Sequence, residues 1–333
     1  MEIKVCPSTL TSGFETYSPQ AIRKLFDGKR VSHIIDFGID KFRTEQYVTD
    51  ALNRISISGV QEKFPAVADG GKIRLAGDNE QSTYILKPAP WDDTIAERKQ
   101  IPANENLTMQ IASQVYGIRT AENGLCFSPA REIIYVTKRF DVDAGGDKYG
   151  MEDFSSLLGK TKYSSGINYK YTGSYEDIAR VIRRYVPAWM VAMEEFFRIV
   201  VFNYIYGNGD AHLKNFSLMG KDGDYVLSPA YDLLNTCIHI EGDDFALCDG
   251  LSLSMPKSDV YSRTGHPCRK DFEDFGLLIG LQRKRTERIL DMFSNVPELS
   301  RTLVANSFLS DKMKRKYILV VETRVKRFGR EGN

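Results

Sequence analysis

The stretch "NYIYGNGDAHLKNFSL" (203–218) places polar, functional side chains directly after a long apolar run. The residues before it, "PAWMVAMEEFFRIVVF" (187–202), are apolar on nearly every side, which is typical of a buried central helix. Asp210, His212, Lys214 and Asn215 then follow within a few residues, beside two glycines. The pattern predicts a buried helix that ends in an irregular loop carrying chemistry.

The spacing beyond Asp210 indicates which chemistry. Asn215 lies five residues later, and Asp232 follows seventeen residues after that, beyond two short strand-like pieces. Phosphoryl transfer requires a carboxylate that accepts the proton of the attacking hydroxyl, and oxygen ligands that hold magnesium against the phosphates. The D-x-x-x-x-N spacing with a later Asp is the arrangement of a kinase catalytic loop, although His212 here follows the Asp. We therefore expect Asp210 to act as base, with Asn215 and Asp232 as metal ligands.

A kinase also needs cationic and backbone groups around the nucleotide phosphates. Lys87, in the strand-like "YILKP" (84–88), is placed to bind them, and Glu105 in "ANENL" is the candidate to orient that lysine. The turn-prone "ISISGVQEKF" (55–64) is a candidate for a loop of N–H groups over the phosphates. Taken singly, each residue has an ordinary structural explanation, such as a solvated lysine or a turn serine. Their order along the chain is what favours a kinase.

Composition sets limits on the other classes of function. The chain has 333 residues, 42% of them hydrophobic and 27% charged, with a net charge of +1, so its overall charge indicates neither nucleic acid nor a membrane surface as a partner. The N-terminus lacks the pattern of a signal peptide, which predicts a cytoplasmic protein without a membrane anchor. Five unevenly spaced cysteines favour reduced thiols. Cys237, His239, Cys248, His266 and Cys268 lack zinc-site spacing and are more simply packing residues.

Hydrophobic periodicity predicts two kinds of structure along the chain. Residues 18–28 are expected to form a short helix capped by Ser18, and residues 50–140 to run strand, strand, strand, helix, strand. Beyond about residue 150 the pattern is almost all helical, with a capping pair at Ser174 and Asp177. We expect an α+β, two-lobed protein-kinase-like fold. Residues 1–140 would form a small mixed α/β nucleotide-binding lobe, and residues 141–333 a mostly helical lobe with the catalytic loop.

These segments resemble the HipA-like serine/threonine kinases, which are toxins of bacterial toxin–antitoxin modules. The resemblance covers about residues 50–240 and includes "ISISGVQEKF", "YILKP", "NENLTMQIA", "KRFD", "YGMEDFSSLLG", "GNGDAHLKNFSL" and "SPAYDLLNT". Only some 55 residues precede the first of these segments, where longer HipA proteins carry an additional small subdomain. The short N-terminus looks like the HipT type, in which a separate small protein supplies that subdomain.

The resemblance implies roles for individual residues. Asp210 is the catalytic base, Asn215 and Asp232 bind Mg²⁺, and Glu105 orients Lys87. Ser56 and Ser58 match positions of autophosphorylation. "TKRF" (137–140) departs from the more common V-E-R-F pattern of the family. The departure concerns the side-chain contacts of Lys138 and leaves the backbone contacts of this segment unchanged. The ATP-binding residues implied are Ser58, Gly59, Val60, Gln61, Glu62, Lys63, Lys87, Lys138, Arg139, Phe140, His212, Leu213, Lys214, Asn215, Tyr231 and Asp232.

The function expected from this resemblance is an ATP- and Mg²⁺-dependent protein kinase toxin. Its implied substrate is an aminoacyl-tRNA synthetase, and its implied partner is a helix-turn-helix antitoxin, through which it would contact DNA only indirectly. Two alternatives remain open: a kinase-fold binding module that docks a repressor without phosphotransfer, and a small-molecule kinase. The segment 311–330 carries eight Lys or Arg against two acids. A solvated basic helix face explains it more simply than contact with DNA phosphates.

Overall fold

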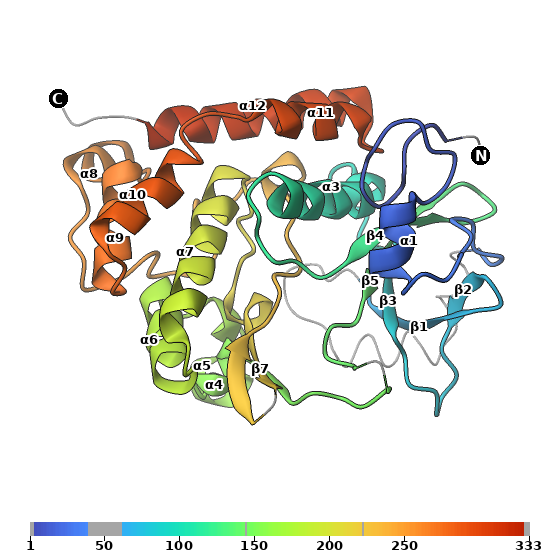
Figure 1. Ribbon diagram of the computed structural model, residues 1–333. Helices are drawn as coiled ribbons and strands as arrows, with labels where there is room; N and C mark the ends of the chain where they lie inside the picture. Colours follow the sequence, from blue (N-terminus) through green and yellow to red (C-terminus); the bar gives the residue numbers. More distant parts are fainter. Residues whose placement is uncertain (1–2, 39–61, 144, 222, 330–333) are drawn as a thin grey trace. The chain divides into compact units, whose positions relative to one another are not determined.

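The computed structural model describes residues 3–38, 62–143, 145–221 and 223–329. The chain divides into two compact units, both discontinuous in sequence. Unit 1 comprises residues 1–111, 121–148 and 302–314, and unit 2 comprises residues 112–120, 149–301 and 315–333. A sheet dominates the first unit and helices dominate the second (Figure 1).

Unit 1 is built on a five-stranded antiparallel sheet with the strand order β2-β1-β3-β5-β4. A tight turn at Gly70 and Gly71, both with positive φ, joins β1 to β2, as the two β-rich runs around these glycines predict. The sequence missed β4 because "NGLCF" is short, contains a glycine and is buried at every position, so it shows no alternation. The bounds are β1 (Phe64–Asp69), β2 (Lys72–Leu75), β3 (Tyr84–Lys87), β4 (Asn123–Phe127) and β5 (Ile133–Lys138).

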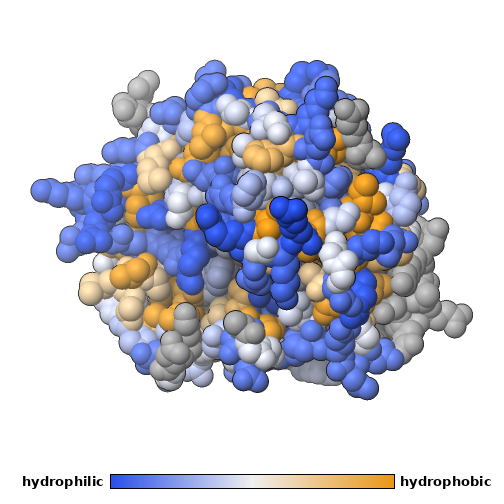
Figure 2. All heavy atoms as spheres, turned by 45° about the vertical axis from the view of Figure 1, so that its right-hand side comes forward, coloured by the Kyte–Doolittle hydropathy of each residue, from blue (hydrophilic) through white to orange (hydrophobic). Residues whose placement is uncertain are grey.

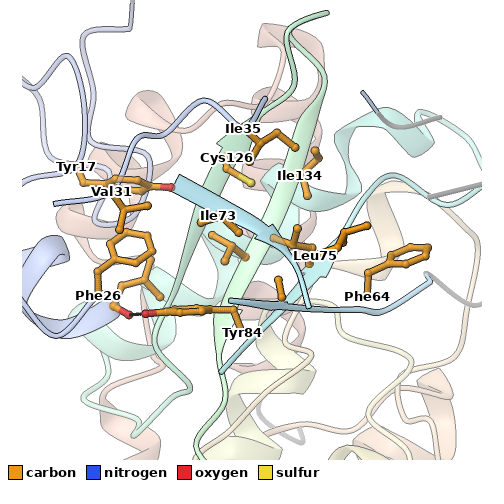
Figure 3. Packing of buried hydrophobic residues seen from close by; sticks show 14 of the residues in the cluster. Tyr17, Phe26, Val31, Ile35, Phe64, Ile73, Leu75, Tyr84, Cys126 and Ile134 are labelled. Carbon is orange, nitrogen blue, oxygen red and sulfur yellow. Dashed lines mark hydrogen bonds between the residues drawn. The ribbon is translucent and has the colours of Figure 1, made fainter. Parts of the chain in front are cut away.

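The N-terminal residues pack against this sheet. Helix α1 (Pro19–Leu25) begins as predicted, with the Ser18 side chain accepting a hydrogen bond from the backbone N–H of Ala21. Tyr17 donates its hydroxyl to the Leu125 carbonyl at 2.8 Å, and Tyr84 donates to the Leu25 carbonyl at 2.9 Å. These buried phenols tie α1 and the segment before it to β3 and β4, in the core shown in Figure 3.

Helix α3 (Ile101–Gln114) follows a short 3₁₀ helix, η2 (Arg98–Gln100). After this helix the chain turns at Gly117, where φ is +60°. Asn106 on α3 donates its amide to the Ser8 carbonyl at 3.2 Å and to Asn123 Oδ1 at 2.9 Å. The buried polar face of α3 is therefore hydrogen-bonded to the N-terminal segment and to β4.

Unit 2 is organised around α7 (Trp189–Ile205), the central buried helix that the apolar run predicts. Helix α6 (Tyr175–Tyr185) packs against it and opens with the predicted capping box of Ser174 and Asp177. A small antiparallel sheet in the order β6-β7-β8 joins β6, which precedes α6, to β7 and β8, which follow α7. Its strands are β6 (Met151–Asp153), β7 (Ser217–Lys221) and β8 (Asp224–Leu227).

The other helices of the second half are shorter, except for the last one. They are α4 (Phe154–Leu157), α5 (Lys162–Ser165), η3 (Tyr169–Tyr171), η4 (Leu213–Asn215), η5 (Thr236–Ile238), α8 (Asp259–Thr264), α9 (Arg269–Leu278), α10 (Arg283–Asp291), α11 (Glu298–Asn306) and α12 (Asp311–Phe328). The predominance of helices after residue 150 agrees with the sequence pattern.

The surface is mainly hydrophilic on the face shown in Figure 2. Apolar side chains appear there in small separate groups, as on the surface of most folded proteins. None of the helices in the described ranges combines the length and hydropathy needed to cross a bilayer. Within those same ranges, no three His, Cys, Asp or Glu side chains are grouped as metal ligands. In particular, His266 is hydrogen-bonded to Asp244 at 2.7 Å.

Candidate active site

The loop after α7 is fixed by hydrogen bonds between its asparagines. The Asn208 amide donates to Asn203 Oδ1 on α7 at 2.9 Å, and Asn208 Oδ1 accepts the backbone N–H of Asp210 at 3.2 Å. The backbone N–H of Gly209 donates to Thr236 Oγ1 at 2.8 Å, and Thr236 in turn donates to the Gly207 carbonyl at 3.1 Å. The rigid end of α7 thereby sets the position of the Asp210 backbone.

The Asp210 side chain accepts a hydrogen bond from a residue far away in the sequence. Tyr171, at the end of η3, donates its hydroxyl to Asp210 Oδ1 at 2.7 Å. The Tyr171 ring also meets the ring of His212 edge-on, with centroids 5.2 Å apart. His212 is buried, so its imidazole is part of the packing around the loop. Leu213 is fully buried as well and anchors η4.

Asn215 and Asp232 lie together, as their predicted shared role requires. The Asn215 amide donates to Asp232 Oδ2 at 3.5 Å. Asn215 Oδ1 is buried, and no described residue donates a hydrogen bond to it. A buried amide oxygen in need of a partner, next to a carboxylate, suits a hard cation such as Mg²⁺, which prefers oxygen ligands. The residues present therefore fit the metal that the sequence implies.

The backbone at Asp232 is unusual, because φ is +56° at a residue other than glycine. Asp and Asn are the residue types most readily tolerated in this left-handed region. The preceding Tyr231 is held firmly: its hydroxyl donates to the Lys214 carbonyl at 2.9 Å and lies 2.6 Å from Ser217 Oγ. Burial raises the pKa of Tyr231 well above its ordinary value, so the phenol stays protonated and remains a donor.

Lys214, predicted to bind ATP, has an acidic neighbour within the same unit. Its Nζ lies 3.8 Å from Asp153 Oδ2, while 42% of its side chain remains exposed. Asp153 is also the N-cap of α4 and accepts the backbone N–H of Ser156 at 2.9 Å. The ion pair connects the catalytic loop to the end of β6, a contact that the sequence did not indicate.

In unit 1 the two residues proposed to act as a pair are in contact. Lys87 Nζ on β3 lies 2.5 Å from Glu105 Oε1 on α3, and the two side chains are only 5% and 2% exposed. The ammonium group also lies 5.2 Å from the centre of the Tyr135 ring, on the neighbouring strand β5. A buried ion pair with this geometry holds the lysine in one orientation, as a phosphate-binding lysine requires.

The ATP-binding residues that the resemblance implies after β5 and at its end also have partners within the protein. Lys138 Nζ lies 2.5 Å from Asp27 Oδ1, and the Arg139 guanidinium pairs with Asp141. Both of their backbone N–H groups are used as well, toward the carbonyls of Glu122 and Thr83. Phe140 lies two residues beyond the end of β5. The contribution of these side chains to nucleotide binding stays a prediction.

The predicted phosphate loop is only partly described. Glu62 and Lys63 lead into β1 within unit 1. Ser56, Ser58, Gly59, Val60 and Gln61 lie outside the described residues. The structure therefore does not describe the two predicted autophosphorylation sites, Ser56 and Ser58.

Comparison with known proteins agrees with this architecture. Residues 55–299 match the family model of the HipA-like C-terminal domain. A Haemophilus influenzae protein named "Putative kinase" is 28% identical over 280 residues, which are 80% of this chain and 79% of that protein. "Putative kinase Y4dM" of Sinorhizobium fredii is 34% identical over 209 residues, but these cover only 58% of this chain and 48% of that protein.

A solved structure shares the fold. The HipA chain in the complex of Shewanella oneidensis HipA, HipB and operator DNA superimposes with a TM-score of 0.63 at 19% sequence identity. The match covers 82% of this chain and 65% of the HipA chain. The fold is thus the expected α+β, kinase-like one. Because the family model spans more than half of the sequence, the chain belongs to the family of HipA-like C-terminal domains.

Proposed function

We propose that the protein is an ATP- and Mg²⁺-dependent serine/threonine protein kinase. The observation that carries the proposal is the contact of Asn215 with Asp232, on a loop whose backbone hydrogen bonds lead from Asp210 through His212 to Asn215. Asp210 accepts the proton of the acceptor hydroxyl as this hydroxyl attacks the γ-phosphate of ATP, and ADP is the leaving group. Asn215 and Asp232 hold the metal through oxygen atoms. The bound Mg²⁺ supplies positive charge that offsets the charge of the phosphates.

Two groups in unit 1 complete the proposed assignment. Lys87, oriented by Glu105, binds the nucleotide phosphates, and the loop Ser58–Lys63 covers them with backbone N–H groups. The segment Lys138–Phe140 lies beside the adenine. The relatives named as kinases support this assignment. In unit 2, nucleotide binding is assigned to four residues beside the proposed base and metal ligands: His212, Leu213, Lys214 and Tyr231.

The biological role that we propose is that of a toxin in a toxin–antitoxin module. The support is the HipA structure, which is a toxin–antitoxin complex of HipA with HipB and operator DNA. A helix-turn-helix antitoxin is the proposed partner, and an aminoacyl-tRNA synthetase is the proposed substrate. Autophosphorylation at Ser56 or Ser58 would place about −1.5 to −2 charges in the phosphate loop and weaken ATP binding.

The decisive variant for this proposal is Asp210→Asn. It keeps the side-chain volume but removes the carboxylate that accepts the proton, so we expect transfer of radiolabelled γ-phosphate to lysate proteins to be abolished while the melting temperature is retained. Mass spectrometry of the labelled products separates a protein acceptor from a small-molecule acceptor. Transfer by Asp210→Asn near the rate of the unmodified protein would contradict the role of Asp210. An absence of transfer by the unmodified protein as well would favour the binding-module alternative.

Mass spectrometry of the protein after incubation with ATP tests the regulatory part. A phosphate on Ser56 or Ser58 is the expected finding, and Ser56→Asp or Ser58→Asp is expected to lower ATP affinity. Both serines unmodified in an active preparation would contradict autophosphorylation at this loop.

A further inference from the structure

Tyr171 lies beside the proposed catalytic base, although 39 residues separate the two in the sequence. Its hydroxyl donates to Asp210 Oδ1 at 2.7 Å. At this separation, an O–H group that donates to a carboxylate forms a short, charge-assisted hydrogen bond. The base and the phenol thus form one unit within the catalytic region.

The Tyr171 side chain is itself held in place on several sides. Its ring packs edge-on against His212, and Lys170 Nζ lies 4.8 Å from the centre of the ring. Its backbone carbonyl accepts the N–H of Cys248 at 2.9 Å, and its backbone N–H donates to the Asn168 carbonyl at 2.9 Å. A donor fixed in this way can transmit a defined orientation to the group that it contacts.

We propose that Tyr171 is a positioning residue, whose hydroxyl fixes the rotation of the Asp210 carboxylate so that it receives the proton of the acceptor hydroxyl. This inference rests on the proposed kinase function. Rotation about the terminal bond of an aspartate side chain is broad, so a carboxylate without a fixed donor samples many orientations. Catalysis by proton transfer depends strongly on the alignment of the base with the reacting group. Tyr171 does not touch the reacting atoms, and it acts through Asp210.

The same contact also has an opposite interpretation, and the experiment must distinguish it from positioning. A phenol that donates to Asp210 resembles an acceptor hydroxyl, and it would compete with the substrate if it occupied the substrate's position. Removal of a competing hydroxyl raises the rate, whereas removal of a positioning hydroxyl lowers it. The fixed ring and its packing against His212 favour positioning.

The experiment compares Tyr171→Phe with Tyr204→Phe. Tyr204 also lies in unit 2, is buried, and donates its hydroxyl to the Pro267 carbonyl at 2.7 Å, so its substitution removes a comparable hydrogen bond away from Asp210. Initial rates of radiolabelled phosphate transfer to bacterial lysate proteins are measured as the ATP concentration varies, and each variant is melted in parallel. We expect Tyr171→Phe to lower the maximal rate about tenfold, with the KM for ATP unchanged. Tyr204→Phe should keep the maximal rate.

The outcomes separate this inference from the proposed function. If the unmodified protein transfers phosphate and Asp210→Asn does not, the kinase function stands. An unchanged or increased maximal rate in Tyr171→Phe would then overturn the positioning role alone. An equal loss of rate in Tyr204→Phe would also overturn it, since the effect would then follow from loosened packing. If the unmodified protein transfers no phosphate, the proposed function itself fails.

Discussion

At the scale of single residues, burial makes the protein sensitive to the loss of either partner of the Lys87–Glu105 ion pair. Both side chains are almost completely buried, and their charged atoms lie 2.5 Å apart. Removing an ion from water is costly, and the opposite charge offsets that cost only while both partners are present. The pair is therefore better understood as a device for orientation than as a net source of stability.

This view gives a prediction for a double-mutant cycle. Glu105→Gln alone, or Lys87→Met alone, should lower the free energy of unfolding by about 3–5 kcal/mol, because one buried charge loses its partner. The double variant Lys87→Met/Glu105→Gln should be destabilised by less than the sum of the two single changes. Urea unfolding of the four proteins measures the coupling. Strictly additive effects would show that the two charges do not stabilise each other.

The proposed magnesium ligands give a second prediction at this scale. Asp232→Asn removes the carboxylate charge but keeps a side chain that tolerates the observed φ of +56°. We expect this variant to melt like the unmodified protein without ligand, but to lose the stabilisation by Mg-ATP, which reaches about 2.7 kcal/mol at a hundredfold excess over Kd. Thermal melts with and without EDTA measure the dependence on metal. Full Mg-ATP stabilisation of Asp232→Asn would contradict its role as a ligand.

The sequence predicts those functional residues that belong to a motif with fixed spacing. It does not predict contacts between residues that lie far apart in the chain. The order of Lys87, Glu105, Asp210, Asn215 and Asp232 follows from motif spacing, and the structure brings Lys87 to Glu105 and Asn215 to Asp232. The role of Tyr171 was not predictable, since no local pattern connects it with Asp210. The ion pair of Lys138 with Asp27 joins residues 111 positions apart and was equally hidden.

At the scale of elements, the turn that ends α7 has little room for a side chain. Gly207 has a φ of +67°, and a Cβ added there would lie 2.8 Å from Asn235 Oδ1 and 2.9 Å from Val320 Cγ1. Both distances are shorter than normal contacts, so a side chain would force the turn to shift. The turn that connects α7 to Asp210 therefore favours a residue without a side chain at position 207.

Gly207→Ala should therefore cost more stability than an alanine at a glycine that is restricted by φ alone. The control is Gly265→Ala, at the C-cap of α8, where φ is +74° and nothing lies within 4 Å of the added Cβ. The backbone conformation alone costs about 1–2 kcal/mol for a residue other than glycine. We expect Gly265→Ala to show that cost, and Gly207→Ala to exceed it in urea unfolding. Equal losses would mean that the neighbours of Gly207 yield easily.

Element boundaries show what periodicity captures and what it misses. The capping box of α6 and the length of α7 follow from local side-chain chemistry and from a continuous apolar run. Strand β4 and the packing of the N-terminal segment against it depend on long-range pairing, such as the bond from Leu125 N to the Pro7 carbonyl at 2.7 Å. Such pairings leave no period in the sequence, so they appear only in the structure.

At the scale of the whole molecule, the basic residues of α12 are largely used within the protein. Arg324 is buried and forms an ion pair with Asp244 at 2.5 Å, and Lys312 pairs with Glu97 at 2.8 Å. Lys314 and Lys316 donate to the backbone carbonyls of Ala305 and Ile238. Each of these basic residues of α12 is thus bound to a partner in the unit to which it belongs.

The final prediction concerns binding of the free protein to DNA. A cation that neutralises a DNA phosphate releases a counterion, so the salt dependence of affinity counts such contacts, with a slope of about −0.9 per phosphate. Because most cations of α12 have internal partners and the net charge of the chain is only +1, we expect α12 to contribute at most about one or two such contacts. Fluorescence anisotropy of labelled duplex DNA, titrated at several salt concentrations, should therefore give weak binding. Its salt slope should hardly change when Arg315 and Lys326, both exposed, are replaced by alanine. A steep slope that this double substitution flattens would show that α12 does present a phosphate-binding face, and the internal contacts of its other cations would then not account for its basic character.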